Sequence, residues 1–217
     1  MGKGQGRKPP ERGYSQAPRG QGGSSRKKPA SYEDIEALPV GWIGEIVDEE
    51  LVAQPRPAFG HQRAAWALGG QLYTPFDRGQ GGPGGWWIFY EPELHFGQNV
   101  LVPDLAGWRR ERMPQPPRPT APFATSAPDW ICEILSPSTA TVDRARKLPI
   151  YHREGVCHAW VIDPLERTLE VFHRSRRGWM LAESHAGQSV VRAIPFESVA
   201  LELSALWLPG SEIAYVP

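Results

Sequence analysis

The chain has 217 residues, of which 40% are hydrophobic, so it is long enough for one substantial globular domain with a full core. No apolar run approaches the roughly 20 residues that a membrane-spanning helix needs, so we expect no membrane contact. The two cysteines, Cys132 and Cys157, exclude a disulfide scaffold, and the N-terminus lacks a secretory signal pattern. These features predict a reduced, cytoplasmic protein.

The formal net charge is zero, but the charges are unevenly distributed. Residues 1–30 contain eight Lys and Arg against one Glu, which leaves 16 basic and 23 acidic residues in the rest. This basic tail is rich in Gly, Gln, Ser and Pro, a composition that predicts disorder. It suits either weak contact with nucleic acid or a solubilising role. We therefore expect a disordered tail over 1–30 and a single domain over 31–210.

Hydrophobic periodicity and turn residues predict the elements of the first half of this domain. In chain order they are a helix over Tyr32–Leu38, strands over Trp42–Val47 and Leu51–Gln54, a helix from about His61 to Phe76, and strands over Trp86–Tyr90, Leu94–Phe96 and Val100–Val102, the last continuing into Leu105–Trp108. Residues 111–128 are expected to form a long surface loop.

The second half is predicted to begin with a strand–helix–strand unit. Its elements are strand Trp130–Leu135, helix Thr141–Glu154, strand Val156–Asp163, a hairpin of Thr168–His173 with Trp179–Ser184, and a last strand and short helix within Ala200–Trp207. A strand–helix–strand unit favours parallel pairing, whereas the earlier strands suggest an antiparallel meander. The fold class expected is α/β or α+β, with a mixed β-sheet flanked by helices.

Glu133 stands out because it lies in the middle of the apolar strand Trp130–Leu135. Strand alternation places Glu133 on the same face as Ile131 and Leu135, a face that a helix is expected to cover. A lone buried carboxylate costs several kcal/mol unless a cation or hydrogen-bond donors compensate it. The sequence therefore predicts a partner for Glu133 elsewhere in the chain.

Asp104, which follows Pro103 near the end of another predicted strand, is a candidate to lie beside Glu133. Two converging carboxylates are hard oxygen ligands that suit Mg²⁺. Such an ion could polarise a phosphate and activate water for attack. In the alternative interpretation Glu133 pairs with an arginine, and Asp104 only caps a turn.

Lys147 is the third candidate, because the helix that carries it starts directly after the Glu133 strand. It shares a helix face with Asp143 and Tyr151, at spacings of four residues. Folded back over the carboxylates, Lys147 would stabilise charge on a phosphoryl transition state. On spacing alone, an exposed Asp143–Lys147 pair explains the pattern better.

Several segments together resemble the Uma2 family, also grouped as DUF820, from Tyr32 to about Trp207. Residues 42–52 (WIGEIVDEELV) resemble its ELIDGEL strand pair, Pro57 with His61–Gln62 its P…HQ helix start, 102–105 (VPDL) its PDL, and 130–139 (WICEILSPST) its EVLSPST. The family's D…K…Y…GV…W..DP series is similar to a set of residues further along the chain. These are Asp143, Lys147, Tyr151, Gly155–Val156, Trp160 and Asp163–Pro164. Glu49 departs from the family's usual Gly, a change that affects the hairpin turn.

The resemblance implies a restriction-endonuclease-like PD-(D/E)XK fold, in which Asp, Glu and Lys surround Mg²⁺ or Mn²⁺ to hydrolyse phosphodiester bonds. Carried over by position, it implies that Asp104 and Glu133 ligate the metal and that Lys147 is the catalytic lysine. Leu135 occupies the usual lysine position, so Lys147 must come from the following helix. Glu45 matches a family acid that either completes the metal shell or forms a strand-edge salt bridge.

His61 and Tyr151 are secondary candidates, and a histidine on an apolar helix face is more often a satisfied core residue. The function expected is a metal-dependent endonuclease acting on DNA, and homodimerisation would suit cleavage of two strands. The alternative is a catalytically inactive nuclease fold that acts as an interaction or regulatory module. A two-carboxylate glycosidase fits less well, because a lysine beside the acids suits phosphate better than a sugar oxygen.

Overall fold

The computed structural model describes residues 28–209. Most of the predicted basic tail, residues 1–27, lies outside the described residues, and so do residues 210–217. Within residues 28–209, no helix has both the length and the apolar composition that a membrane span requires.

The N-terminal part alternates short strands with one long helix. Its elements are α1 (Tyr32–Glu36), β1 (Trp42–Val47), β2 (Glu50–Pro55), α2 (Phe59–Leu72) with a π-helical turn at Tyr73–Asp77, β3 (Trp86–Tyr90), β4 (Leu94–Phe96), β5 (Asn99–Leu101) and β6 (Leu105–Arg109). A capping box starts α1, since Ser31 and Asp34 bond reciprocally.

The C-terminal part carries the strand–helix–strand unit and two hairpins. Its elements are β7 (Trp130–Ile134), α3 (Ala140–Val142) with a π-helical turn at Asp143–Lys147, α4 (Leu148–Glu154), β8 (His158–Asp163), β9 (Thr168–Ser175), β10 (Gly178–Ala186), β11 (Val190–Val191), β12 (Leu201–Glu202) and a 3-10 helix at Leu203–Leu206. Gly155, with φ of 95°, ends α4 in the left-handed region that glycine tolerates.

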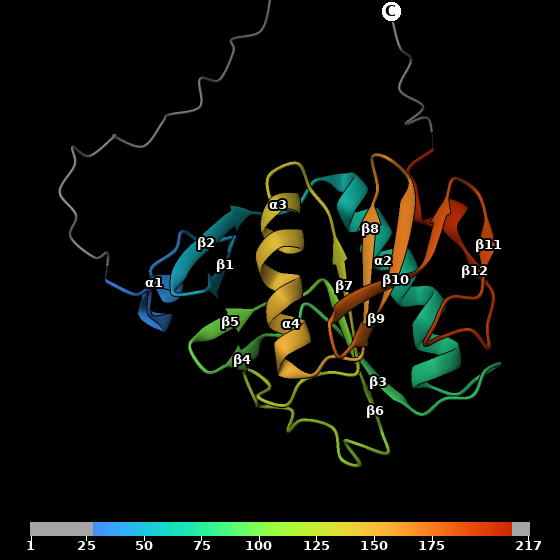
Figure 1. Cartoon of the computed structure of the whole chain (residues 1–217), viewed down its shortest axis with the longest axis horizontal. Helices are drawn as coiled ribbons and strands as arrows, with labels where there is room; N and C mark the ends of the chain where they lie inside the picture. The colour runs from blue at the N-terminus through green and yellow to red at the C-terminus, as the bar shows by residue number, and fades with distance from the viewer. Residues whose placement is uncertain (1–27, 210–217) are drawn as a thin grey trace, which may run out of the picture.

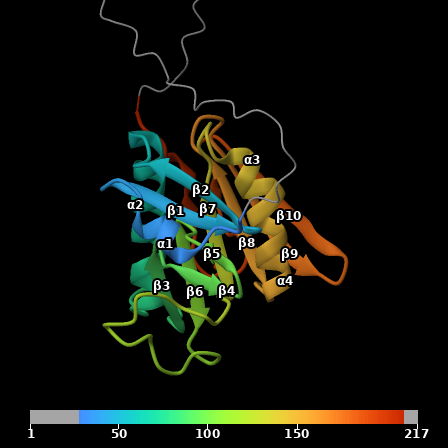
Figure 2. The ribbon, with the colours of Figure 1, turned by 90° about the vertical axis from the view of Figure 1, so that its left-hand side faces the viewer.

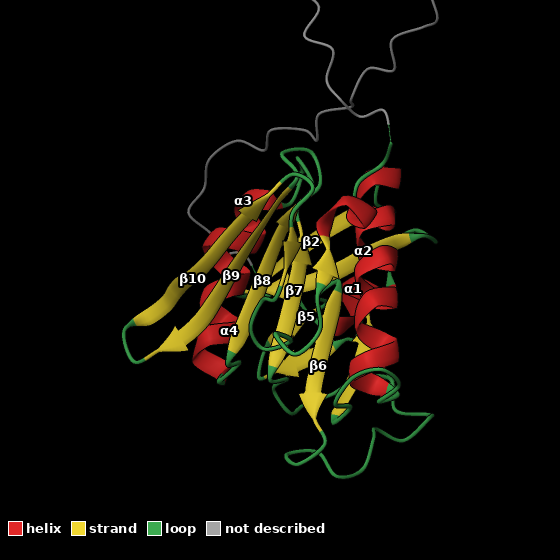
Figure 3. Cartoon of the chain, turned by 90° about the vertical axis from the view of Figure 1, so that its right-hand side faces the viewer, coloured by secondary structure: helices red, strands yellow, loops and turns green. Residues whose placement is uncertain are grey.

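A six-stranded mixed sheet in the order β10–β9–β8–β7–β6–β3 forms the centre of the molecule. Only β7 and β8 pair in parallel, as the strand–helix–strand unit predicted. Helix α2 covers one face of this sheet, and the α3–α4 segment covers the other (Figures 1 and 3). The predicted class, a mixed sheet flanked by helices, is confirmed.

A second, four-stranded antiparallel sheet has the order β2–β1–β5–β4. Its β1–β2 hairpin crosses the molecule between α2 and the α3–α4 segment (Figure 2). The expected continuation of Val100–Val102 into Leu105–Trp108 is wrong, because β5 and β6 belong to different sheets. Pro103 lacks the N–H that a central ladder needs, so the chain changes sheets there. Asp104 thus lies at the junction of the two sheets.

Candidate functional site

Strand β7 presents two chemically different faces, as its alternation predicted. Trp130, Cys132 and Ile134 pack into an apolar core with α2 and the 3-10 helix. Ile131 belongs to a second core that includes Tyr151 of α4. Glu133 shares that face and is only 2% exposed. It is therefore a carboxylate within a well-packed interior.

Asp104 lies close to Glu133, directly before the neighbouring strand β6. Strand β6 pairs antiparallel with β7, with Leu105 opposite Cys132. Asp104 directly precedes β6, and its side chain and that of Glu133 line the same small space. Asp104 Oδ2 also accepts a hydrogen bond of 2.6 Å from the Ile134 backbone N–H. The two carboxylates are therefore neighbours.

The segment that follows β7 directs Lys147 back onto Glu133. Lys147 Nζ lies 2.9 Å from Glu133 Oε1 and 3.3 Å from Asp143 Oδ1. Its turn is π-helical, with the Leu148 N–H donating to the Asp143 carbonyl. Pro149 has no N–H of its own to donate, so the regular helical ladder is already interrupted here. Such turns are frequent at functional sites.

Glu133 and Lys147 have two further buried partners. Tyr151 Oη donates a hydrogen bond of 2.6 Å to Glu133 Oε1. Glu45 of β1 lies 2.9 Å from Lys147 Nζ and accepts the Val102 N–H at 2.7 Å. Glu45 therefore forms the salt bridge that was one of its two expected roles, and its role as a metal ligand stays a prediction.

Burial and charge set the protonation states of this group. Burial raises the pKa of Glu133 well above its ordinary value, and the carboxylates of Asp143, Asp104 and Glu45 outnumber the opposing Lys147. For Lys147, burial alone would lower the pKa, but Glu133 and Glu45 outweigh it and raise the pKa well above its ordinary value. Lys147 is therefore a cation at neutral pH, which suits it to electrostatic stabilisation and excludes it as a general base.

His61 of α2 pairs with Asp104, with Nε2 to Oδ1 at 3.0 Å. Burial lowers the pKa of His61, but the hydrogen bond and the charge of Asp104 outweigh it, so that the pKa is raised. Its Nδ1 atom is buried without a hydrogen-bond partner among the described residues. One ring nitrogen of His61 therefore has a hydrogen-bond partner and the other has none among the described residues, and the charge of the ring depends on Asp104.

A small cavity of about 20 Å³ opens among these groups. Asp104, Glu133, Asp143, Lys147 and His61 line it. A volume of this size holds about one water or ion. The structure thus brings Asp104, Glu133, Lys147 and His61 around a common space, whereas Glu45 and Tyr151 contact the group from outside the lining.

Two acidic residues that line the cavity were not among the predicted site residues. Asp143 could have been found, because its i−4 spacing from Lys147 was evident, but the pair was expected to be exposed. It is 4% exposed. Glu91 had no sequence signal. It follows β3 with φ of 44°, an uncommon conformation for a non-glycine residue, and such strain often marks functional sites.

The residues around the cavity match a divalent cation in charge and in donor type. Four carboxyl groups, those of Glu45, Asp104, Glu133 and Asp143, face Lys147 and His61, so acidic groups outnumber basic ones. Burial raises the pKa of Glu133 and of Glu45, and a bound cation would favour their ionised forms. Among residues 28–209, no three His, Cys, Asp or Glu side chains form a ready cage for a metal ion. Mg²⁺ commonly uses only one or two carboxylates and takes its other ligands from water and phosphate.

Comparisons with known proteins identify the family and a similar fold. The profile of the Uma2 family, described as "Putative restriction endonuclease", matches residues 26–205. The fold is similar to that in a crystal structure of "a putative nuclease belonging to DUF820" from Anabaena variabilis, with a TM-score of 0.61 and 22% identity over 82% of this chain and 97% of the other. No curated protein matches the chain. Because the profile spans most of its length, the chain belongs to the Uma2 family.

Proposed function

We propose that this protein is a metal-dependent endonuclease that hydrolyses phosphodiester bonds in DNA, with Mg²⁺ or Mn²⁺ as its cofactor. The observation that carries the proposal is the surplus of buried carboxylates around one cationic lysine, beside a cavity of about 20 Å³. A buried group with excess negative charge is costly unless a cation joins it. The family description supports the same reaction class.

Asp104 and Glu133 would hold the metal, since both line the cavity and supply hard oxygen atoms. When bound, the ion would polarise the scissile phosphate and lower the pKa of a water nucleophile. Tyr151 keeps the Glu133 carboxylate oriented through its hydrogen bond of 2.6 Å. His61 does the same for Asp104, and a raised pKa favours its charged form.

Lys147 would offset the negative charge that builds on the phosphoryl oxygens during attack. Its ammonium lies 2.9 Å from Glu45, 2.9 Å from Glu133 and 3.3 Å from Asp143. Because three carboxylates fix its position and keep it protonated, no reorganisation is needed when the phosphate arrives. Glu45 acts here as a positioning residue for the lysine.

The test is cleavage of supercoiled plasmid DNA by the purified chain in Mg²⁺, in Mn²⁺ or in EDTA. Glu133→Gln keeps the size and the acceptor oxygen but removes the charge, so we expect nicking to fall at least about 100-fold. Glu170→Gln is the matched control, because Glu170 lies on β9 and pairs with Arg144 outside the cavity. That control should nick like the wild type.

Equal nicking by the wild type and Glu133→Gln, or nicking that persists in EDTA, would contradict the proposed metal-dependent nuclease. A folded wild type that neither nicks DNA nor binds metal would favour the alternative, a nuclease fold serving as an interaction or regulatory module. Column chromatography of the same samples would test the homodimer that cleavage of two strands suggests.

A further inference from the structure

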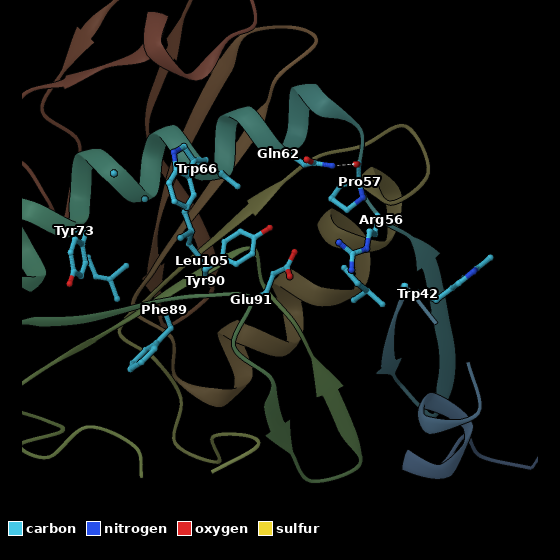
Figure 4. A pocket seen from close by; sticks show the side chains of 16 residues that line it. Trp42, Arg56, Pro57, Gln62, Trp66, Tyr73, Phe89, Tyr90, Glu91 and Leu105 are labelled. Atoms are coloured by element: carbon cyan, nitrogen blue, oxygen red, sulfur yellow. Dashed lines mark hydrogen bonds between the residues drawn. The ribbon is translucent and has the colours of Figure 1, made fainter. Parts of the chain in front are cut away.

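A groove of about 1030 Å³ lies between α2, β3 and the β1–β2 hairpin (Figure 4). It is fifty times larger than the carboxylate cavity and lies directly beside it, because Ile43, Pro57 and Glu91 line both. Whatever occupies this groove therefore extends toward Asp104 and Glu133. Its lining should reveal what kind of molecule reaches the candidate site.

Exposed aromatic side chains dominate the wall of the groove. Trp66 of α2 is 81% exposed, and Tyr73, the first residue of the π-helical turn that continues α2, is 50% exposed. Tyr90 of β3 is 53% exposed, and Trp42 of β1 is 45% exposed. Trp66 and Tyr73 are seven residues apart and so share one stripe of the helix. Clusters of large apolar side chains at a protein surface often mark binding sites.

Two glycines keep the helical wall of the groove open. Gly69 and Gly70 line it between Trp66 and Tyr73, and a Cβ at Gly70 would meet no atom within 4 Å. Glycine inside a helix costs about 1 kcal/mol relative to alanine. Close packing therefore does not explain why glycine occupies position 70. Unobstructed access to the aromatic rings of Trp66 and Tyr73 does explain it.

Two backbone groups of β3 are bonded to side chains. Asp77 Oδ2 accepts the Ile88 N–H at 2.9 Å, and Arg110 Nε donates to the Trp86 carbonyl at 3.0 Å. Edge strands blocked in this way resist pairing with a further strand. These two contacts occupy backbone groups that a second copy of the chain, or an extended peptide, would need for strand pairing. The groove offers ring faces instead.

We propose that this groove binds single-stranded nucleic acid, with its bases stacked on Trp66, Tyr90 and the neighbouring rings. The inference rests on the proposed function and adds to it the form of the substrate. Every base has a π-face, so stacking needs no particular sequence, but in a duplex these faces are hidden. The groove leads an unpaired strand to the carboxylate cavity.

The charges of the groove favour the same occupant. Among the residues described as lining it, Arg56 is the one cation and Glu91 the one acid. Duplex binding without base contacts depends on many phosphate contacts from Lys and Arg, which this lining does not supply. Stacking is less dependent on such contacts, and Arg56 provides one partner for the backbone. The chain after the basic tail has more acidic than basic residues, and it can still bind a single strand in this way.

The test measures binding of fluorescein-labelled 12-nucleotide DNA to the full chain by anisotropy in EDTA. Three ligands of equal length are compared: a single strand, a duplex and an abasic single strand. The abasic strand keeps the phosphates, so it measures binding by the basic residues of the N-terminal tail without stacking. We expect the ordinary single strand to bind at least about tenfold more tightly than either of the others.

Trp66→Ala should weaken single-strand binding at least about fivefold and leave abasic-strand binding unchanged. Trp66 is 81% exposed, so its removal should spare the core, which a thermal melt would verify. Leu181→Ala is the matched control. It removes an exposed apolar side chain from β10, at the opposite edge of the sheet from β3, and should bind like the wild type.

Equal affinity for the three ligands, or no effect of Trp66→Ala, would overturn the inference. So would a Trp66→Ala protein that changes from dimer to monomer without losing single-strand affinity, because the groove would then be a self-association surface. These results are independent of cleavage. A chain that nicks plasmid but shows no single-strand preference loses only this inference, whereas one that binds single strands but never cleaves contradicts the nuclease.

Discussion

Both faces of the central sheet are packed with apolar side chains, but one of them also encloses buried charged groups. On the face toward α2, Phe196 lies edge-on to Trp130, Trp160 and Phe76, with ring centroids 4.7–5.5 Å apart. On the other face, equally buried, Glu133, Lys147 and Glu45 form a charged group. An apolar interior stabilises without further help, whereas a charged interior seldom outperforms an apolar replacement. The buried charges on the second face are therefore explained by function and not by stability.

Lys147→Met should produce the largest change, because it leaves three buried carboxylates without their cation. We expect a loss of about 3–5 kcal/mol in the free energy of unfolding, measured by urea denaturation at pH 7.5. The triple change Lys147→Met with Glu45→Gln and Asp143→Asn should recover much of that loss. If it recovers none, the lysine stabilises by packing alone, and the charged face resembles the apolar one.

Glu133→Gln should abolish metal-dependent activity and yet raise stability by about 1 kcal/mol at pH 8. The folded-state pKa of Glu133 is raised by burial, so its ionisation in the folded protein is penalised and stability declines as pH rises above the unfolded pKa. Gln removes this penalty, so the gain should vanish near pH 4. Urea titrations at both pH values, without metal, measure the difference. A large loss at pH 8 would mean that Glu133 is structural.

His61→Gln should have a smaller effect that depends on pH. The folded-state pKa of His61 is raised, so its pairing with Asp104 contributes stability below the unfolded pKa and loses it as pH rises through the folded value. We expect the wild type to exceed the variant by about 1 kcal/mol at pH 6 and by much less at pH 9. A difference that is constant with pH would show that the imidazolium is not involved.

Gly70→Ala should have the smallest effect on the fold. Because open space surrounds the new Cβ, the variant should gain about 0.5–1 kcal/mol in unfolding free energy through helix propensity alone. Thermal melts of the two proteins measure the gain. A loss in stability would mean that the helix needs glycine at this position for its own geometry.

Much of this architecture follows from local patterns in the sequence. The alternation in Trp130–Ile134 identified both faces of β7, and Gly155 marked the end of α4. Asp104 and Lys147 lie beside Glu133, as the resemblance implied. These features depend on neighbours along the chain or on motifs whose order is preserved.

Other features could not be predicted, because they depend on contacts between distant segments. The change of sheet at Pro103 arises when β1 pairs with β5. The burial of Asp143 follows from the β1 strand, since Glu45 and Asp143 share one lysine. Glu91 had no pattern to identify it, and the aromatic groove combines residues of three elements that are far apart in sequence.

If a divalent cation balances the buried carboxylates, the protein should bind Mn²⁺ through Glu133 and Asp104. Electron paramagnetic resonance of free Mn²⁺, titrated with the full chain at pH 7.5, should show one bound ion in the wild type and in Glu170→Gln. Binding should be at least about tenfold weaker in Glu133→Gln and in Asp104→Asn. Equal Mn²⁺ binding by all four proteins, or none by the wild type, would contradict the account.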